Sequence, residues 1–177
     1  MNTLEAIAAR HCYRGLYEQA PVPREDLTTI MQAGLDAPTG CNRQTVSLIA
    51  VDDPAVLARL RTVLKAPVGK TAPAMVCVLS RHPLPEQDQT FCLQDYAAAI
   101  ENMMLAITEL GYHSCWVEGD LFEQDMLGRR MADILGVPAD YDLVCFLPVG
   151  RAVEPLRSPR KRPFEERAWF NSFGGKV

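Results

Sequence analysis

The sequence of 177 residues lacks several familiar signals of location and function. No apolar run approaches the roughly 20 residues that a helix needs to cross a bilayer, so we expect no membrane association of that kind. The first ten residues contain Glu5 and no long apolar stretch, which is atypical of a secretory signal, and a cytoplasmic protein is expected. The sequence also has no G-x-G-x-x-G turn, Walker motif or G-x-S-x-G elbow. It therefore does not support the usual dinucleotide-fold, phosphate-loop and hydrolase interpretations.

Cysteine and histidine pairs of the kind that bind metals are missing as well. None of the six cysteines lies within three positions of another, and the three histidines are scattered, so a metal site has little support. Cys77 and Cys145 stand in apolar runs and are expected in the core. The formal net charge of -4 argues against a general affinity for nucleic acid.

The patterns that are present indicate an α/β or α+β layered structure, and we expect residues 1–177 to form a single domain. Apolar periodicity and capping residues predict helices at 3–9, 23–37, 54–64, 95–110 and 122–135. Thr3 is the candidate cap of the first helix. Apolar runs predict strands at 45–51, 73–79, 112–117 and 143–149, and the second of these is expected to be central.

The helix predicted at residues 95–110 is apolar around most of its circumference. Its polar residues form pairs that repeat every seven positions on one side: Gln94 and Asp95, Glu101 and Asn102, Thr108 and Glu109. A helix of this kind needs neighbours on several sides. Either its own domain wraps around it or a second subunit covers part of it, and the periodicity does not separate these alternatives.

Two short segments carry the residues with the most chemical potential. The first, Arg10-His11-Cys12-Tyr13-Arg14, points Arg10, Cys12 and Arg14 to one side if it is extended, and guanidinium groups suit phosphates and planar carbonyls. The second, residues 37–44, is a helix end followed by a loop rich in small and amide residues. Taken singly, the first is more often a solvated basic turn and the second an ordinary loop. The basic run at residues 157–162 is likewise most often a solvated tail.

The order and separation of these pieces resemble the FMN-dependent nitroreductase family. That family has an N-terminal Arg-(Arg/His)-Ser-x-(Arg/Lys) segment and, about 25 residues later, a helix that ends in Ala-Pro-Ser-x-x-Asn-x-Gln. The corresponding residues here are Arg10 to Arg14, Ala37-Pro38-Thr39, Asn42 and Gln44. Further matches are Asn102 to Leu105, Gly111, Trp116, Glu118-Gly119, Gly150, Pro155 and the run from Lys161 to Glu166. The resemblance extends from Ile7 to about Glu166, which is nearly the whole chain.

This resemblance implies a nitroreductase-like α+β fold, in which helices flank a central, mostly antiparallel sheet of four to five strands. It implies an intertwined homodimer with FMN at each of two interface sites. Arg10 and Cys12 would hold the FMN phosphate together with Arg160, Lys161 or Arg162, and His11 would add ring or backbone contacts. Arg14 would lie near N1 and O2 of the isoalloxazine ring, where a fixed cation favours hydride acceptance.

The remaining cofactor contacts follow from the same resemblance. Pro38, Thr39 and Gly40 would come from the other subunit, and Asn42 and Gln44 would bond the cofactor or fix their loop. Glu118 and Gly119 would offer backbone N–H groups near flavin N5, and Trp116 belongs to the same set. A pyrimidine contact is expected within residues 65–70, where Lys65 and Lys70 are candidates.

The implied activity is a ping-pong cycle in which NADPH or NADH reduces FMN and a nitroaromatic, quinone or similar acceptor then oxidises it, without a protein nucleophile. Two alternatives stay open. One keeps the fold and FMN but performs enone reduction, reductive dehalogenation or flavin fragmentation, and the other is a non-catalytic flavin-binding dimer. Departures from the family pattern motivate the second alternative: Cys12 replaces a serine, which is a better donor to phosphate, and Thr45-Val46 replaces Pro-Trp.

Overall fold

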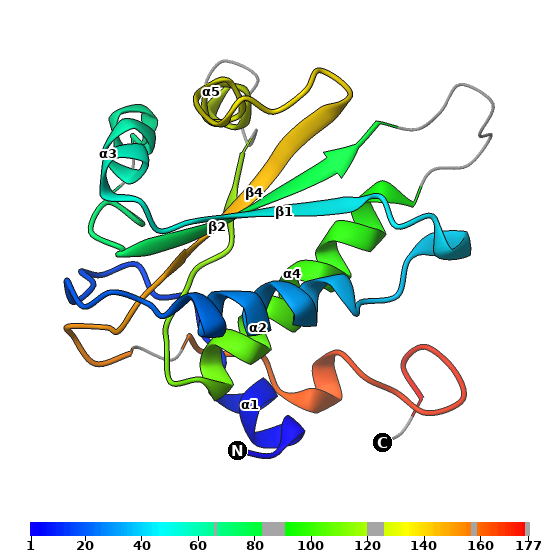
Figure 1. Ribbon diagram of the computed structural model, residues 1–177. Helices are drawn as coiled ribbons and strands as arrows, with labels where there is room; N and C mark the ends of the chain where they lie inside the picture. The colour runs from blue at the N-terminus through cyan, green and yellow to red at the C-terminus, as the bar shows by residue number, and fades with distance from the viewer. Residues whose placement is uncertain (66, 83–90, 120–125, 157–158, 176–177) are drawn as a thin grey trace.

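The computed structural model describes residues 1–65, 67–82, 91–119, 126–156 and 159–175. Its centre is a four-stranded antiparallel sheet with the strand order β1-β2-β4-β3 (Figure 1). The strands are β1 (Val46–Val51), β2 (Ala74–Arg81), β3 (Val117–Glu118) and β4 (Tyr141–Val149). The antiparallel α+β sheet expected from the sequence is confirmed, and the strand predicted at residues 73–79 is central.

Helices cover both faces of the sheet (Figure 1). On one face lie α2 (Arg24–Leu35) and α4 (Cys92–Glu109), with α1 (Thr3–Ala9) packed against α4. On the other face lie α3 (Pro54–Val63) and α5 (Leu127–Leu135). Two 3-10 turns, η1 (Gly40–Asn42) and η2 (Phe164–Glu166), stand outside these layers. Within the ranges given above, no helix has the length and apolar character that a membrane crossing requires.

The central strand β2 is buried because it lies between β1 and β4 and is covered on both faces. Its side chains alternate between two cores: Val76 and Val78 belong to the core with α2 and α4, whereas Met75 and Cys77 belong to the core with α3 and α5. All four side chains are fully buried, as is Cys145 of β4. Covering on both faces explains the uninterrupted apolar run in the sequence, and the core positions expected for Cys77 and Cys145 are confirmed.

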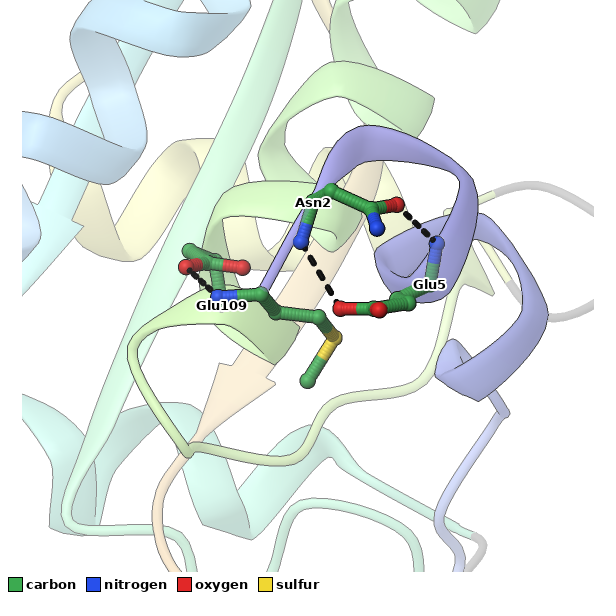
Figure 2. Close-up of polar contacts among 4 residues, drawn as sticks. Asn2, Glu5 and Glu109 are labelled. Carbon is green, nitrogen blue, oxygen red and sulfur yellow. Dashed lines mark hydrogen bonds and ion pairs between the residues drawn. The ribbon is translucent and has the colours of Figure 1, made fainter.

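Helix α1 is fixed at its N-terminal end by a capping box. The Asn2 side chain accepts a hydrogen bond from Glu5 N at 3.0 Å, and the Glu5 carboxylate accepts one from Asn2 N at 2.9 Å (Figure 2). The cap is therefore Asn2, and the expectation that Thr3 caps this helix is wrong, because Thr3 is its first helical residue. The Met1 amino group lies 2.6 Å from Glu109 Oε1, which ties α1 to the C-terminal end of α4.

Two predicted elements are shorter in the structure. The strand expected at residues 112–117 is reduced to isolated bridges at His113 and Ser114, followed by the two residues of β3. The reason is that each residue has a different partner, since His113 pairs with Gly150 and Ser114 pairs with Cys12. No continuous ladder can form between three separate segments. Of the helix predicted at 122–135, the structure describes residues 127–135, and residues 122–125 lie outside the described part of the chain.

Much of helix α4 is buried within its own chain. The core that it shares with α2 and the sheet contains Ala99, Ile100, Met103, Met104 and Ile107. For this part of the helix, wrapping by the same domain is the better alternative. Leu93, near the N-terminal end, is 62% exposed, and its cover by a second subunit stays a prediction. The expectation that Asp95 belongs to the polar side of this helix is wrong. Asp95 is 2% exposed, because its carboxylate accepts hydrogen bonds from the loop before β1.

Candidate functional site

The segment of residues 10–14 is fixed against the residues that follow α4. Cys12 forms a parallel bridge with Ser114, in which Tyr13 N donates to Ser114 O at 2.7 Å. Tyr13 is 5% exposed, and its hydroxyl donates to Leu16 O at 2.6 Å. Because neighbours in an extended chain point to opposite sides, the burial of Tyr13 turns Cys12 and Arg14 the other way. Cys12 is half-buried and Arg14 is exposed.

Two arginines act on the Cys12 thiol, as the sequence predicts. Arg10 Nε lies 3.1 Å from Glu101 Oε1 of α4, and its side chain is 23% exposed. Arg14, two residues after Cys12, is exposed to solvent. Glu101 neutralises part of the Arg10 charge, so Arg14 is the more available cation for a ligand.

The Cys12 thiol also meets a second thiol. Cys115, which is 1% exposed, lies beside the Cys12 thiol, and its Sγ donates to Trp116 O at 3.6 Å. Hydrogen bonding by Cys115, a backbone hydrogen bond at Trp116 and the two arginines lower the pKa of Cys12 to about 5, against the effect of partial burial. The same contact, together with burial, raises the pKa of Cys115. Of the two thiols, Cys12 therefore carries the negative charge at neutral pH.

Two buried polar atoms beside Cys12, Arg10 Nε and Ser114 Oγ, have no hydrogen-bond partner in the described part of the chain. The Glu101 oxygen is close to Arg10 Nε but does not accept its hydrogen. An unpartnered buried polar group costs about 1–3 kcal/mol, so a ligand that restores the bond is favoured here. Guanidinium and hydroxyl donors bind phosphate oxygens. This donor set fits the FMN phosphate, with the exception of the Cys12 thiolate, whose charge opposes it.

Glu118 of the edge strand β3 and Trp116, the residue before that strand, lie near this segment. Trp116 Nε1 donates to Glu118 Oε1 at 2.8 Å. Glu118 lies opposite Cys145 of β4, and the next residue, Gly119, donates its N–H to Val144 O at 2.8 Å. The alternation of antiparallel pairs therefore directs the Glu118 N–H away from β4, toward the open edge of the sheet. The Gly119 N–H donates to the sheet, so the N–H of Glu118 is the more available donor, and the contact of either residue with a flavin stays a prediction.

A buried carboxylate holds the loop between α2 and β1. Asp95 accepts hydrogen bonds from Gly40 N and from Thr45 Oγ1, both at 2.8 Å. These two bonds fix the loop at both ends of η1. The loop is also pressed against Phe91, since a Cβ on Gly40 would lie 2.3 Å from the Phe91 ring. The N-terminal end of α4 thus determines where this loop lies.

The loop itself has an unusual backbone. Cys41, Asn42 and Gln44 have φ values of 54°, 53° and 50°, in the left-handed region that residues with a side chain seldom adopt. Gln44 N donates to Thr39 Oγ1 at 3.2 Å, and Gln44 Nε2 donates to Asn42 Oδ1 at 3.3 Å. Of the two roles expected for Asn42 and Gln44, the structure supports the one in which they fix their loop.

The two predicted segments lie at different places along α4. The loop of residues 38–44 is held by Asp95 near the start of the helix, whereas residues 10–14 meet Glu101 and the chain beyond the helix end. Figure 1 shows η1 beyond one end of α2 and residues 10–20 beyond the other. One chain therefore does not unite the two segments into one site, and their union in the homodimer that the resemblance implies stays a prediction.

The other predicted contacts lie mainly on the surface. The segment after β4 runs on the side of the sheet that carries α1 and α4 (Figure 1). Arg160, Lys161 and Arg162 within it are exposed, and residues 157–158 of the same basic run lie outside the described residues. The exposed set also includes Pro38, Lys65 and Lys70; His11 is half-buried, with Nδ1 at 2.5 Å from Ala9 O. Over the described ranges, no group of three or more His, Cys, Asp or Glu side chains is arranged to hold a metal.

Comparison with known proteins identifies the relatives of this arrangement. Residues 7–68 and 61–151 match the sequence profile of the Nitroreductase family. The chain belongs to the nitroreductase family. Over 157 residues it is 27% identical to a Methanothermobacter thermautotrophicus protein that is provisionally named NADH dehydrogenase/NAD(P)H nitroreductase. That alignment covers 87% of this chain and 79% of the relative.

Solved structures of the nitroreductase family have the same fold. A nitroreductase with bound FMN from Bacteroides fragilis NCTC 9343 has a TM-score of 0.73 and 27% identity, over 92% of this chain and 95% of that one. An FMN-dependent nitroreductase from Clostridium difficile R20291 has a TM-score of 0.80 and 23% identity, over 96% and 99%. The nitroreductase-like fold expected from the sequence is confirmed.

Asp95, Ser114 and Cys115 are site residues that the sequence did not single out. Asp95 belongs to a regular polar pattern, and its partners lie 50 and 55 positions earlier in the chain. Ser114 and Cys115 precede the Trp116 of the family pattern without being part of it. No local signal marks these residues, because their roles arise from contacts between distant segments.

Proposed function

We propose that this nitroreductase-family protein is an FMN-dependent oxidoreductase that uses NADPH or NADH to reduce nitroaromatics, quinones or similar acceptors in a ping-pong cycle. The observation that carries the proposal is the donor set around Cys12, where Arg10 Nε and Ser114 Oγ have no hydrogen-bond partner among the described residues and Arg14 is exposed. The FMN-bound relative supports the choice of cofactor, and the names of the relatives support a nicotinamide donor. Bound FMN would supply the hydride-transfer chemistry.

The residues of this chain would bind and orient the cofactor. Arg10 and Ser114 would donate to the phosphate, and one or more of the exposed Arg160, Lys161 and Arg162 would add charge to it. Arg14 would lie against the isoalloxazine ring and stabilise negative charge on it. The Glu118 N–H, directed to the open edge of β3, would donate to the ring near N5. Trp116 would fix the Glu118 side chain through the Nε1 hydrogen bond.

The proposal includes a homodimer built from single-domain chains of residues 1–177. The loop of residues 38–44 and the segment of residues 10–14 are separated along α4 within one chain. A partner loop carrying Pro38, Thr39 and Gly40 would complete each site, and exposed Leu93 near that loop would be covered by the partner. Light scattering coupled to gel filtration tests this part, with a mass of twice 19.7 kDa as the expected result.

The test of the function is the visible absorption spectrum of the purified protein, recorded anaerobically before and after addition of NADPH and then NADH. Flavin bands that bleach support the proposal and identify the preferred donor. Bands that persist with both donors indicate a binding role without this activity. If no flavin binds after FMN is added, the proposal is wrong.

A matched pair of variants ties that spectrum to the site. Arg14→Ala removes the exposed cation next to Cys12, and Arg129→Ala removes an exposed cation on α5. We expect Arg14→Ala to weaken FMN binding at least tenfold, since a charge-assisted contact is worth about 1.5–3 kcal/mol. Arg129→Ala should bind FMN as the wild type does. Equal FMN affinities of the two variants would contradict the assigned site.

A further inference from the structure

The loop of residues 67–72 lies between α3 and the chain that follows residues 10–14. Ala72 N donates to Gly69 O at 3.2 Å, which closes a turn just before β2. From α3, Arg61 Nη2 donates to Ala72 O at 2.8 Å, and Ala72 is fully buried. The loop is therefore anchored to α3 at the end that leads into β2.

Thr71 of this loop binds the chain that follows residues 10–14 at two points. Tyr17 N donates to Thr71 Oγ1, and Gln19 Nε2 donates to Thr71 O, both at 2.9 Å. Tyr17 pairs with Ala152 in an antiparallel bridge whose hydrogen bonds are made by the neighbouring residues, so the Tyr17 N–H points away from the bridge. Tyr17 is 2% exposed, and a buried N–H without an acceptor is costly. The Thr71 hydroxyl is therefore the acceptor that holds this part of the chain.

Arg14 lies between two anchored backbone amides. Before it, Tyr13 N donates to Ser114 O at 2.7 Å, and after it, Tyr17 N is held by Thr71. The turn between these anchors is compact, because the Tyr13 hydroxyl donates at 2.6 Å to the carbonyl of the residue before Tyr17. The rings of Tyr13 and Tyr17 also pack edge to face, with 5.1 Å between their centroids. The backbone of Arg14 is thus fixed on both sides, while its side chain is exposed.

We propose that Thr71 is a positioning residue for Arg14: by holding the Tyr17 amide it fixes the backbone from which the Arg14 guanidinium reaches a flavin ring. This inference rests on the proposed function, in which Arg14 lies against the isoalloxazine ring. Thr71 itself needs no contact with the cofactor. A cation whose backbone is fixed before the cofactor arrives loses less conformational freedom on binding, and its charge acts from a constant place.

Hydrogen exchange of the flavin-free, full-length protein tests the anchor. Thr71→Val keeps the shape of the side chain and removes the acceptor, whereas Thr71→Ser keeps the hydroxyl. We expect the Tyr17 amide to exchange at least tenfold faster in Thr71→Val than in the wild type, and within about twofold of the wild type in Thr71→Ser. Thr62→Val is the matched control, since its hydroxyl donates to Arg59 O within α3. Unchanged Tyr17 exchange in Thr71→Val would overturn the proposal.

A double-mutant cycle separates positioning of Arg14 from a general loosening of the site. FMN affinity is measured by quenching of flavin fluorescence for the wild type, Arg14→Ala, Thr71→Val and the double variant. We expect Thr71→Val to weaken FMN binding about fivefold when Arg14 is present, and less than about 1.5-fold in the Arg14→Ala background. Thr71→Ser should restore the affinity of the wild type. Equal losses in both backgrounds would show that Thr71 does not act through Arg14 and would overturn the proposal.

A second variant keeps the test decisive if Thr71→Val does not fold. Gln19→Ala removes the other hydrogen bond to Thr71 from an exposed side chain, and we expect FMN binding about twofold weaker, again only when Arg14 is present. Gln32→Ala, which removes an exposed hydrogen bond within α2, should bind FMN as the wild type does. A wild type that binds no FMN would refute the proposed function and the positioning role with it. Normal FMN binding with independent effects of the variants would refute the positioning role alone.

Discussion

Removal of the Asp95 carboxylate should release the loop of residues 38–44 without unfolding the domain. The carboxylate is 2% exposed and accepts two hydrogen bonds at 2.8 Å, from Gly40 N and Thr45 Oγ1. Asp95→Ala removes both acceptors, and Asp95→Asn keeps one oxygen for Gly40 N. The Thr45 hydroxyl is able to rotate and accept from the new amide group, so the two variants separate loss of geometry from loss of charge.

The expected magnitude is the difference between two opposing contributions. Hydrogen bonds to a charged group contribute about 1.5–3 kcal/mol each, so the two bonds together stabilise the native state by about 3–6 kcal/mol. The left-handed conformations of Cys41, Asn42 and Gln44 cost about 1 kcal/mol each, and a released loop recovers this strain. We therefore expect Asp95→Ala to lower the free energy of unfolding by about 2 kcal/mol, and Asp95→Asn by about 1 kcal/mol. For a chain of this size, 2 kcal/mol lowers Tm by about 4–8 °C.

Urea unfolding gives the global free energy, and hydrogen exchange of the Gly40 amide gives the local one. We expect exchange at Gly40 to be at least tenfold faster in Asp95→Ala than in the wild type, because its acceptor is gone. Asp133→Ala, an exposed position on α5, is the matched control and should stay within about 0.5 kcal/mol of the wild type. If Asp95→Ala loses stability while Gly40 exchange is unchanged, Asp95 stabilises α4 alone and the reasoning about the loop fails.

Three further outcomes are expected. Gly119→Ala should lower the free energy of unfolding by more than 2 kcal/mol in urea titrations, because its Cβ would lie 2.4 Å from a backbone oxygen of β4. Gly136→Ala, at a position with φ of 68° and no atom within 4 Å of the added Cβ, should lower it by about 1 kcal/mol. Equal losses of stability would contradict the close approach of Gly119 to β4. Asn2→Ala should cost about 1 kcal/mol through the lost cap and Thr3→Ala less than 0.5 kcal/mol, and the reverse order in the same assay would restore Thr3 as the cap. Cys12→Ser should bind FMN about tenfold more tightly than the wild type at pH 7.5, measured by quenching of flavin fluorescence. This gain should shrink as the pH approaches 5, because Cys12 is a thiolate above its lowered pKa and repels a phosphate; a gain that does not depend on pH would remove the thiolate from the explanation.

Local chemistry is the reason why the sequence predicts much of this fold. Asp53 caps α3 with hydrogen bonds to the N–H groups of Ala55 and Val56, because a short carboxylate before a proline satisfies the free donors of a helix start. Gly111, with φ of 78°, follows Leu110, the C-cap of α4, at the position where a left-handed residue ends a helix. The continuous apolar run of β2 predicts a strand that is covered on both faces. Such features depend on neighbours within a few positions and can therefore be predicted from the sequence.

Only part of the candidate site can be predicted from the sequence. The Arg10-x-Cys12-x-Arg14 spacing predicts two cations around a thiol, since an extended chain repeats every two residues, and both arginines contribute to the lowered pKa of Cys12. The spacing says nothing of Cys115, which lies 103 positions later and reaches Cys12 only through the bridge at Ser114. The same limit applies to Gly119, whose N–H is taken by a strand partner that the local sequence does not name.

The sequence by itself determined the element types, the central strand, the cations at residues 10–14 and the family to which the chain belongs, because each depends on residue type and short spacing. Tertiary structure alone decided that Asp95, expected in an exposed polar stripe, is buried and accepts hydrogen bonds from the loop before β1. It also decided that Cys12 lies beside a second thiol. The physical reason is common to both cases. Burial brings groups from distant segments into contact, and the free energy of a buried carboxylate or thiolate depends on those partners more than on its own neighbours in sequence.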